Sequence, residues 1–153
     1  MLTQITSLLE RLTAPEASNT LDEAELRIAS AALLVHAVAV DGTVTEGEAR
    51  RLQALIAEHF QLAPHEVSRL LIEAERQERD AVDIYRFTSV LRDALPIERK
   101  REIIAMMWRI AFADGQLDAL EDNLIWRTAE LLAVPTRDRM ELKQMVRAEQ
   151  EAE

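Results

Sequence analysis

Residues 36–48, HAVAVDGTVTEGE, return in altered form as residues 109–121, RIAFADGQLDALE. The Asp-Gly pair and the final glutamate of the two copies are both 73 positions apart. In each copy an apolar run leads into Asp-Gly, which is a turn signal, and a helix-capping residue follows shortly after it. The repeat predicts two related halves, each made of a helix, an Asp-Gly loop and a second helix.

Apolar residues recur at helical spacing along almost the whole chain, and Pro, Asp-Gly and capping residues punctuate the pattern. Helices are expected at about residues 2–14, 21–40, 46–60, 64–79, 80–94, 96–113, 119–134 and 135–149. We therefore predict an all-α fold, a single compact domain of about eight helices. Residues 1–20 are assigned to an N-terminal amphipathic helix and residues 21–150 to the main helical domain. The acidic end of the chain, residues 149–153, is expected to fray.

Composition excludes several classes of protein. The 153 residues contain no cysteine, so disulfide scaffolds, Cys-ligated metals and Cys nucleophiles are ruled out. The net charge of −10 is the wrong sign for a non-specific nucleic-acid binder. The longest apolar run, residues 31–40, is about half of a membrane span, and the first residues do not have the pattern expected of a secretory signal. A cytoplasmic protein without a transmembrane segment is the expectation.

The repeated motif Asp-Gly-x-Val/Leu-x-x-x-Glu contains the residues that could bind a metal: Asp41, Glu48, Asp114 and Glu121. It matches the second half of a calcium-binding loop, whereas the positions before each Asp are apolar, so an EF-hand is not predicted. If the two loops meet, their four carboxylates would suit a divalent cation, Ca²⁺ or Mg²⁺ above all.

A purely structural interpretation of the same residues stays open. Thr45 and Asp118 stand three residues before the two glutamates, which is the spacing of a helix capping box. Acidic groups are also favoured at helix N-termini by the helix dipole. The motif is therefore compatible with caps alone.

No other constellation predicts a reaction. His36, His59 and His65 lack metal-ligand spacing, and a hydrogen-bonded structural role is expected for His36. Arg109 takes the place of His36 in the second half and could pair with loop carboxylates. No nucleophile–base arrangement and no Gly-rich phosphate loop is present, so the chain is predicted not to be an enzyme.

Two further groups of side chains are expected to have structural roles. Trp108 and Trp126 stand at core-like helical spacing and are expected in the core. The stripe Arg139, Lys143 and Arg147 alternates with glutamates, which favours a solvated helix face.

With these motifs in place, residues 29–147 resemble the TerB (tellurite-resistance protein B) family. The resemblance is carried by residues 39–48 and 112–121, with residues 83–87 and the helix after Pro135 in support. It implies a compact helical fold with paired halves, a cytoplasmic protein tied to tellurite or broader stress responses, and metal binding by acidic loop residues. The matched positions are again Asp41, Glu48, Asp114 and Glu121. The second half departs from the first at Ala119, where the first has Glu46.

Together these arguments predict a non-catalytic TerB-like stress-response module. It would bind a divalent cation through its paired acidic loops and act with protein partners, and a homodimer is left open. The alternative is a structural helical interaction domain whose acidic loop residues are helix caps.

Overall fold

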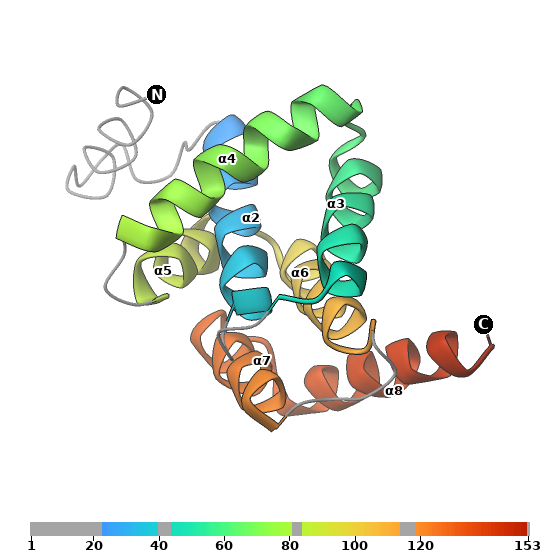
Figure 1. Cartoon of the computed structure of the whole chain (residues 1–153). Helices are drawn as coiled ribbons and strands as arrows, with labels where there is room; N and C mark the ends of the chain where they lie inside the picture. The colour runs from blue at the N-terminus through green and yellow to red at the C-terminus, as the bar shows by residue number, and fades with distance from the viewer. Residues whose placement is uncertain (1–22, 40–43, 81–83, 114–118, 153) are drawn as a thin grey trace.

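The chain folds as a set of packed α-helices (Figure 1). The computed structural model describes residues 23–39, 44–80, 84–113 and 119–152, and every secondary-structure element within them is an α-helix. The helices are α2 (Glu23–Ala39), α3 (Glu46–Phe60), α4 (Pro64–Asp80), α5 (Tyr85–Ala94), α6 (Ile97–Ala111), α7 (Ala119–Leu131) and α8 (Thr136–Ala152). The predicted all-α fold class is confirmed. The expected N-terminal helix, residues 1–20, lies outside the described residues.

Some helix boundaries differ from the sequence prediction. The helix expected at residues 80–94 is assigned from Tyr85, and Asp80 belongs to α4 instead. The helix expected to end at residue 134 ends at Leu131, and Ala133 then adopts a left-handed backbone conformation with φ 63°. Helix α8 extends to Ala152, so within the described residues the acidic end is helical rather than frayed.

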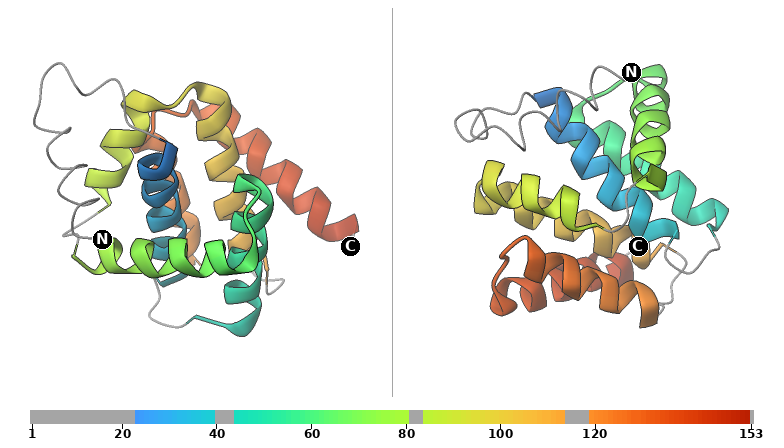
Figure 2. Two further views of the ribbon diagram at one scale, coloured as in Figure 1. Left: turned by 90° about the horizontal axis from the view of Figure 1, so that it is seen from above. Right: turned by 90° about the vertical axis from the view of Figure 1, so that its left-hand side faces the viewer.

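Helices α2 and α6 form the centre of the molecule. Helix α2 packs against α3, α4, α5, α6 and α7, and α6 packs against α3, α7 and α8. Figure 2 shows α4 crossing α2 and α8 running along the far side of α6. The apolar positions predicted for a buried central helix are all buried: Leu26, Leu33, Leu34, Ala37 and Val38. Both helices that lead into the Asp-Gly segments are thus held rigidly by the core.

The repeat seen in the sequence is also a repeat of helices. Helices α2, α3 and α4 correspond to α6, α7 and α8, with α5 between the two sets. The corresponding boundaries keep the offset of the motif to within two residues, and they keep it without deviation at Glu46 and Ala119, where α3 and α7 begin. The packing repeats as well, because α2 lies against α4 as α6 lies against α8.

The turn after the middle helix of each half has the same unusual backbone. Gln61 follows α3 with φ 55°, and Ala133 follows α7 with φ 63°. They are the only non-glycine residues with positive φ in the described parts of the chain. Each precedes the proline at or next to which the following helix begins. The left-handed conformation satisfies carbonyls at the helix end and turns the chain sharply.

Candidate functional site

The two glutamates of the repeated motif occupy equivalent positions. Glu48 and Glu121 lie in the first turns of α3 and α7, with 4% and 6% of their surface exposed. Burial of a carboxylate is costly unless it is paired or hydrogen-bonded, so neither is an ordinary surface glutamate. The other members of the predicted site, Asp41 and Asp114, lie outside the described residues, as does Asp118.

Glu48 forms a complete capping box with Thr45. The Thr45 Oγ1 accepts a hydrogen bond from the Glu48 backbone N–H at 3.0 Å. In return, Glu48 Oε1 accepts from the Thr45 backbone N–H at 3.3 Å and from its hydroxyl at 3.0 Å. The cap predicted from the Thr-x-x-Glu spacing is therefore confirmed in the first half.

The cap uses only one oxygen of the Glu48 carboxylate. The other, Oε2, is buried and has no hydrogen-bond partner within the described part of the chain. Capping and metal ligation therefore do not compete for the same atom. The residues that the structure describes contain no group of three or more His, Asp or Glu placed to hold a metal ion.

The residue five positions before each Asp-Gly pair makes a polar contact with the last helix of its own half. His36 Nδ1 lies 2.9 Å from Glu78 Oε1, joining α2 to α4. Arg109 forms a two-point ion pair with Glu149, joining α6 to α8. The hydrogen-bonded role expected for His36 is confirmed. Arg109 pairs with a glutamate of α8, and the expectation that it meets a loop carboxylate is not supported within the described residues.

Neither glutamate partner was predicted from the sequence, although a signal for both is present in it. Glu78 stands 14 residues after Pro64, and Glu149 stands 14 residues after Pro135. The prolines mark equivalent helix starts, so the glutamates occupy equivalent turns near the helix ends. Extending the comparison of the halves along these helices would have found them.

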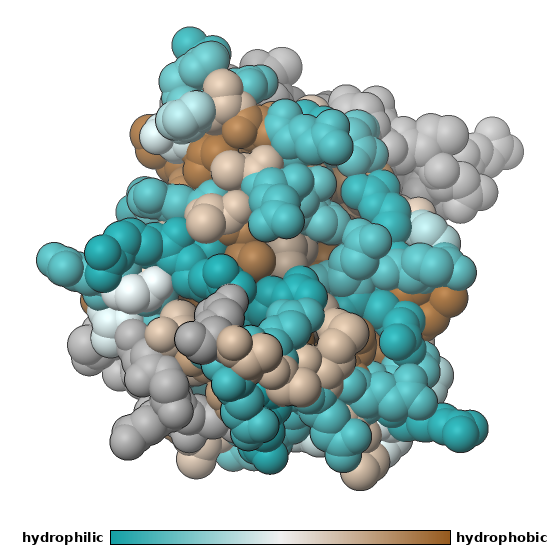
Figure 3. All heavy atoms as spheres, turned by 90° about the vertical axis from the view of Figure 1, so that its right-hand side faces the viewer, coloured by the Kyte–Doolittle hydropathy of each residue, from teal (hydrophilic) through white to brown (hydrophobic). Residues whose placement is uncertain are grey.

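A polar cleft lies where α3, α6 and α8 approach one another. It has a volume of about 560 Å³ and includes Arg51, His59, Glu102, Arg109 and Glu149 in its lining. Burial lowers the pKa of His59 below its ordinary value of 6.5, against the opposing effect of Glu102. The side of the molecule that carries α3 and the end of α8 is mostly hydrophilic, with hydrophobic areas in separate patches (Figure 3). The cleft is lined by both positively and negatively charged groups, so neither sign of charge dominates it.

The basic stripe of α8 makes contacts with aromatic rings that its spacing did not predict. Lys143 Nζ lies 5.1 Å from the centre of the Trp108 ring, and the Arg139 guanidinium lies 6.0 Å from that of Trp126. Arg147 lies in the same way over Phe112, at 5.7 Å. The stripe is at least partly exposed, as expected of a solvated face, but each cation also lies over an aromatic ring, that of Trp108, Trp126 or Phe112.

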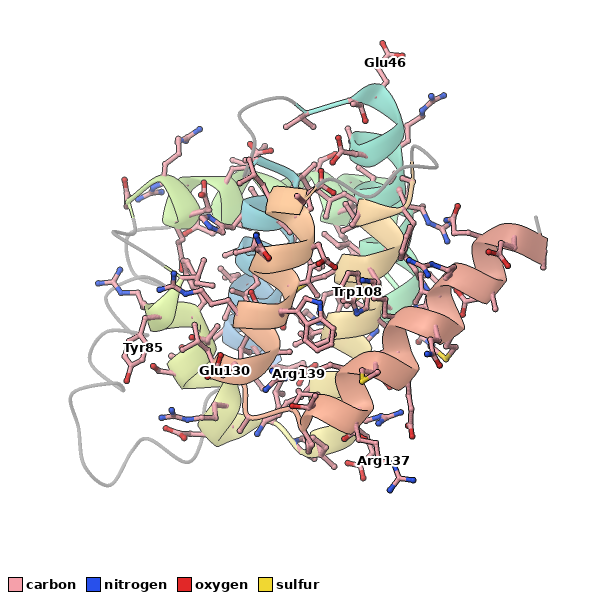
Figure 4. The ribbon with its side chains drawn as sticks, turned by 90° about the horizontal axis from the view of Figure 1, so that it is seen from below. Glu46, Tyr85, Trp108, Glu130, Arg137 and Arg139 are labelled. Carbon is pink, nitrogen blue, oxygen red and sulfur yellow. The ribbon has the colours of Figure 1, made fainter. Side chains whose placement is uncertain are left out.

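Both tryptophans have the structural role predicted for them. Trp108 is fully buried, and Trp126 packs against the core with its ring edge-on to Trp108, 6.3 Å between centres. Figure 4 shows Trp108 in the interior between α6, α7 and α8, whereas Glu46 lies at the outer end of α3. The acidic end of α3 is thus at the margin of the molecule.

Fold and site together define a class of protein: an all-helical module of two related halves, each with a buried acidic residue at the start of its middle helix. None of the helices described is both long and apolar enough to cross a lipid bilayer. Residues 27–144 match the family model described as tellurite resistance protein TerB, which covers more than half of the chain. The chain therefore belongs to the TerB family. Comparisons with curated proteins and with solved structures gave no match.

Proposed function

We propose that this protein is a non-catalytic TerB module that binds a divalent cation, Ca²⁺ or Mg²⁺, through its paired acidic segments. Asp41, Glu48, Asp114 and Glu121 would supply the carboxylates. The module would act with protein partners in a cytoplasmic stress response. Membership of the TerB family and the duplicated Asp-Gly…Glu motif support this proposal.

One observation carries the proposal furthest: the buried Oε2 of Glu48, which has no partner among the described residues. Leaving a buried charged oxygen unpaired costs more than leaving a neutral group unpaired. A hard cation would satisfy this oxygen while Oε1 stays in the capping box. The rigid attachment of α3 to the core would hold the carboxylate in place before the cation arrives.

Calorimetric titration of the chelator-treated protein with Ca²⁺, Mg²⁺, Mn²⁺ and Zn²⁺ tests the proposal. We expect saturable binding by the wild type and none by the double variant Asp41→Ala/Asp114→Ala. Added cation should also raise the melting temperature of the wild type alone, because only the binding-competent folded state gains free energy from the ligand.

Two single variants separate ligation from capping. Glu48→Gln keeps a side chain that can complete a capping box but removes the charge, so it should weaken cation binding by roughly tenfold or more. Thr45→Ala removes the cap and leaves the Glu48 carboxylate, so it should lower stability by about 1 kcal/mol with or without cation. Equal affinity of Glu48→Gln and wild type would argue against Glu48 as a ligand.

The second candidate function is a structural helical interaction domain. The complete capping box at Thr45 and Glu48 favours it, because capping alone accounts for the position of both residues. In that case no cation would bind either protein, and the alanine variants would cost stability alone. The search for function would then move to protein partners.

A further inference from the structure

An apolar groove runs between the N-terminal part of α2 and α4. It has a volume of about 550 Å³. Its apolar lining includes Ile28 of α2, Leu62 before α4, and Leu70 and Ile72 of α4. Ile72 is 57% exposed, which is the largest exposure among the large apolar residues described. A groove of this kind between two helices suits a third amphipathic helix.

One face of α2 and one face of α4 line the groove. Ala24, Arg27 and Ile28 share one face of α2, and Glu66, Arg69, Leu70 and Glu73 share one face of α4. Ile28 is buried but does not belong to the main hydrophobic cluster of the molecule. It therefore forms part of the floor of the groove rather than of the central core.

We propose that the occupant of this groove is the chain's own residues 1–20, docked as an amphipathic helix. Leu2, Ile5, Leu8, Leu9 and Leu12 recur at helical spacing and form one apolar stripe. A lone helix of about 12 residues is marginal in water, so this stripe needs a surface to cover it. Both the stripe and the groove are narrow apolar surfaces, so each could cover the other.

The connection between segment and groove makes docking within one molecule favourable. Ala24, which lines the groove, is separated from the segment's last apolar residue, Leu12, only by a short tether. Ten residues separate Leu12 from Glu23, where the described part of α2 begins, and a linker of about that length spans roughly 15–20 Å, enough to reach the groove and short enough to give an effective concentration of the order of millimolar.

The charged groups of the groove are compatible with this occupant. Arg27 and Arg69 line the groove and form no ion pair with other described residues, and Arg27 Nε is buried without a hydrogen-bond partner there. The lining also contains Glu66 and Glu73, and the segment carries Glu10, Arg11 and Glu16, so each surface offers charges of both signs for pairing. The family match begins only at residue 27, so the segment is an addition to the part of the chain that the family model matches.

Cysteine cross-linking in the full chain tests the proposal, because the natural sequence contains no cysteine. Leu8→Cys/Ile72→Cys places one thiol on the stripe and one on the groove, and Leu8→Cys/Met145→Cys places the second thiol on exposed Met145 of α8. We expect rapid disulfide formation within the monomer for the Ile72 pair only. Equal rates in both pairs, or dimers whose yield rises with protein concentration, would overturn the proposal; the latter would indicate docking onto a second copy.

Amide hydrogen exchange gives a second test that does not depend on disulfide geometry. Leu8→Asp/Leu12→Asp should raise exchange at residues 24–28 and 66–73 and leave α8 unchanged, because the docked helix would be released. Ser7→Asp, on the opposite side of the predicted helix, is the matched control and should have no effect. Unchanged exchange in the double variant would show that the segment does not occupy the groove.

Discussion

The guanidinium of Arg109 donates two hydrogen bonds to the carboxylate of Glu149, from Nε to Oε2 and from Nη2 to Oε1, both at 3.0 Å. This pair joins the residue five positions before the second Asp-Gly segment to the end of α8. His36 and Glu78 make the corresponding contact in the first half. The two halves thus share the position of the contact but differ in its chemistry, with an arginine in one and a histidine in the other.

Glu149→Gln should lower the free energy of unfolding by about 0.5–1 kcal/mol at neutral pH, since the pair is partly exposed and screened by solvent. Hydrogen bonding to Arg109 holds the pKa of Glu149 below its ordinary value of 4.5. Its contribution is therefore present above that ordinary value and is lost as pH falls through the lowered pKa. Urea unfolding at several pH values should show the difference between variant and wild type disappear in acid. Glu151→Gln, on the same exposed helix end, is the control, and an equal loss there would contradict a specific pair.

Much of this architecture could be predicted from sequence because the signals are local. The Asp-Gly repeat identified the two halves, and Thr45 with Glu48 identified the cap, since a turn or a cap depends on residues a few positions apart. The partners Glu78 and Glu149 depend on which helices face each other, which spacing along one helix does not specify.

The basic stripe of α8 shows the same limit. Arg139, Lys143 and Arg147 at four-residue intervals, with glutamates nearby, are typical of a solvated face. Only the packing of α8 on α6 and α7 places aromatic rings beneath them. Of the predicted metal site, the sequence indicated the residue types, and the buried Oε2 of Glu48 could be recognised only from the structure.

Ala133→Gly should stabilise the protein by up to about 1 kcal/mol. Ala133 has φ 63°, a conformation that costs a residue with a Cβ roughly 1–2 kcal/mol. Glycine removes this strain, but it also raises the conformational entropy of the unfolded chain, which offsets part of the stabilisation. Thermal unfolding measures the change. Ala148→Gly, within the exposed part of α8, should instead destabilise by about 1 kcal/mol. A loss of stability in Ala133→Gly would mean that its methyl group makes contacts worth more than the strain.

His59 should make stability depend on pH near neutrality. Burial lowers its pKa below 6.5, so the unfolded chain binds a proton more readily than the folded one between the lowered pKa and 6.5. Stability from this residue is complete above about pH 6.5 and is lost as pH falls through that window. His59→Gln should therefore flatten the rise in melting temperature as the pH increases through this window. His65→Gln, at an exposed position, should retain the wild-type slope, and an unchanged slope in His59→Gln would contradict the assignment.

Lys143 should contribute to stability through its charge as well as its packing. Its Nζ lies 5.1 Å from the centre of the Trp108 ring and 3.0 Å from Asp122 Oδ1, so one ammonium joins α8 to both α6 and α7. Lys143→Met keeps an unbranched chain of similar length but removes the charge. We expect a loss of about 1 kcal/mol in urea unfolding, because a cation over an aromatic ring and a partly buried ion pair each contribute of that order or less.

The only other lysine provides the matched control for this effect. Lys100 of α6 forms no ion pair among the described residues, so Lys100→Met should change stability by less than about 0.5 kcal/mol. Combining Lys143→Met with Asp122→Asn separates the two contacts, since the double variant should lose less than the sum of the single losses. Full additivity would leave the Trp108 ring as the only partner that matters, and equal effects of Lys143→Met and Lys100→Met would show that neither contact does.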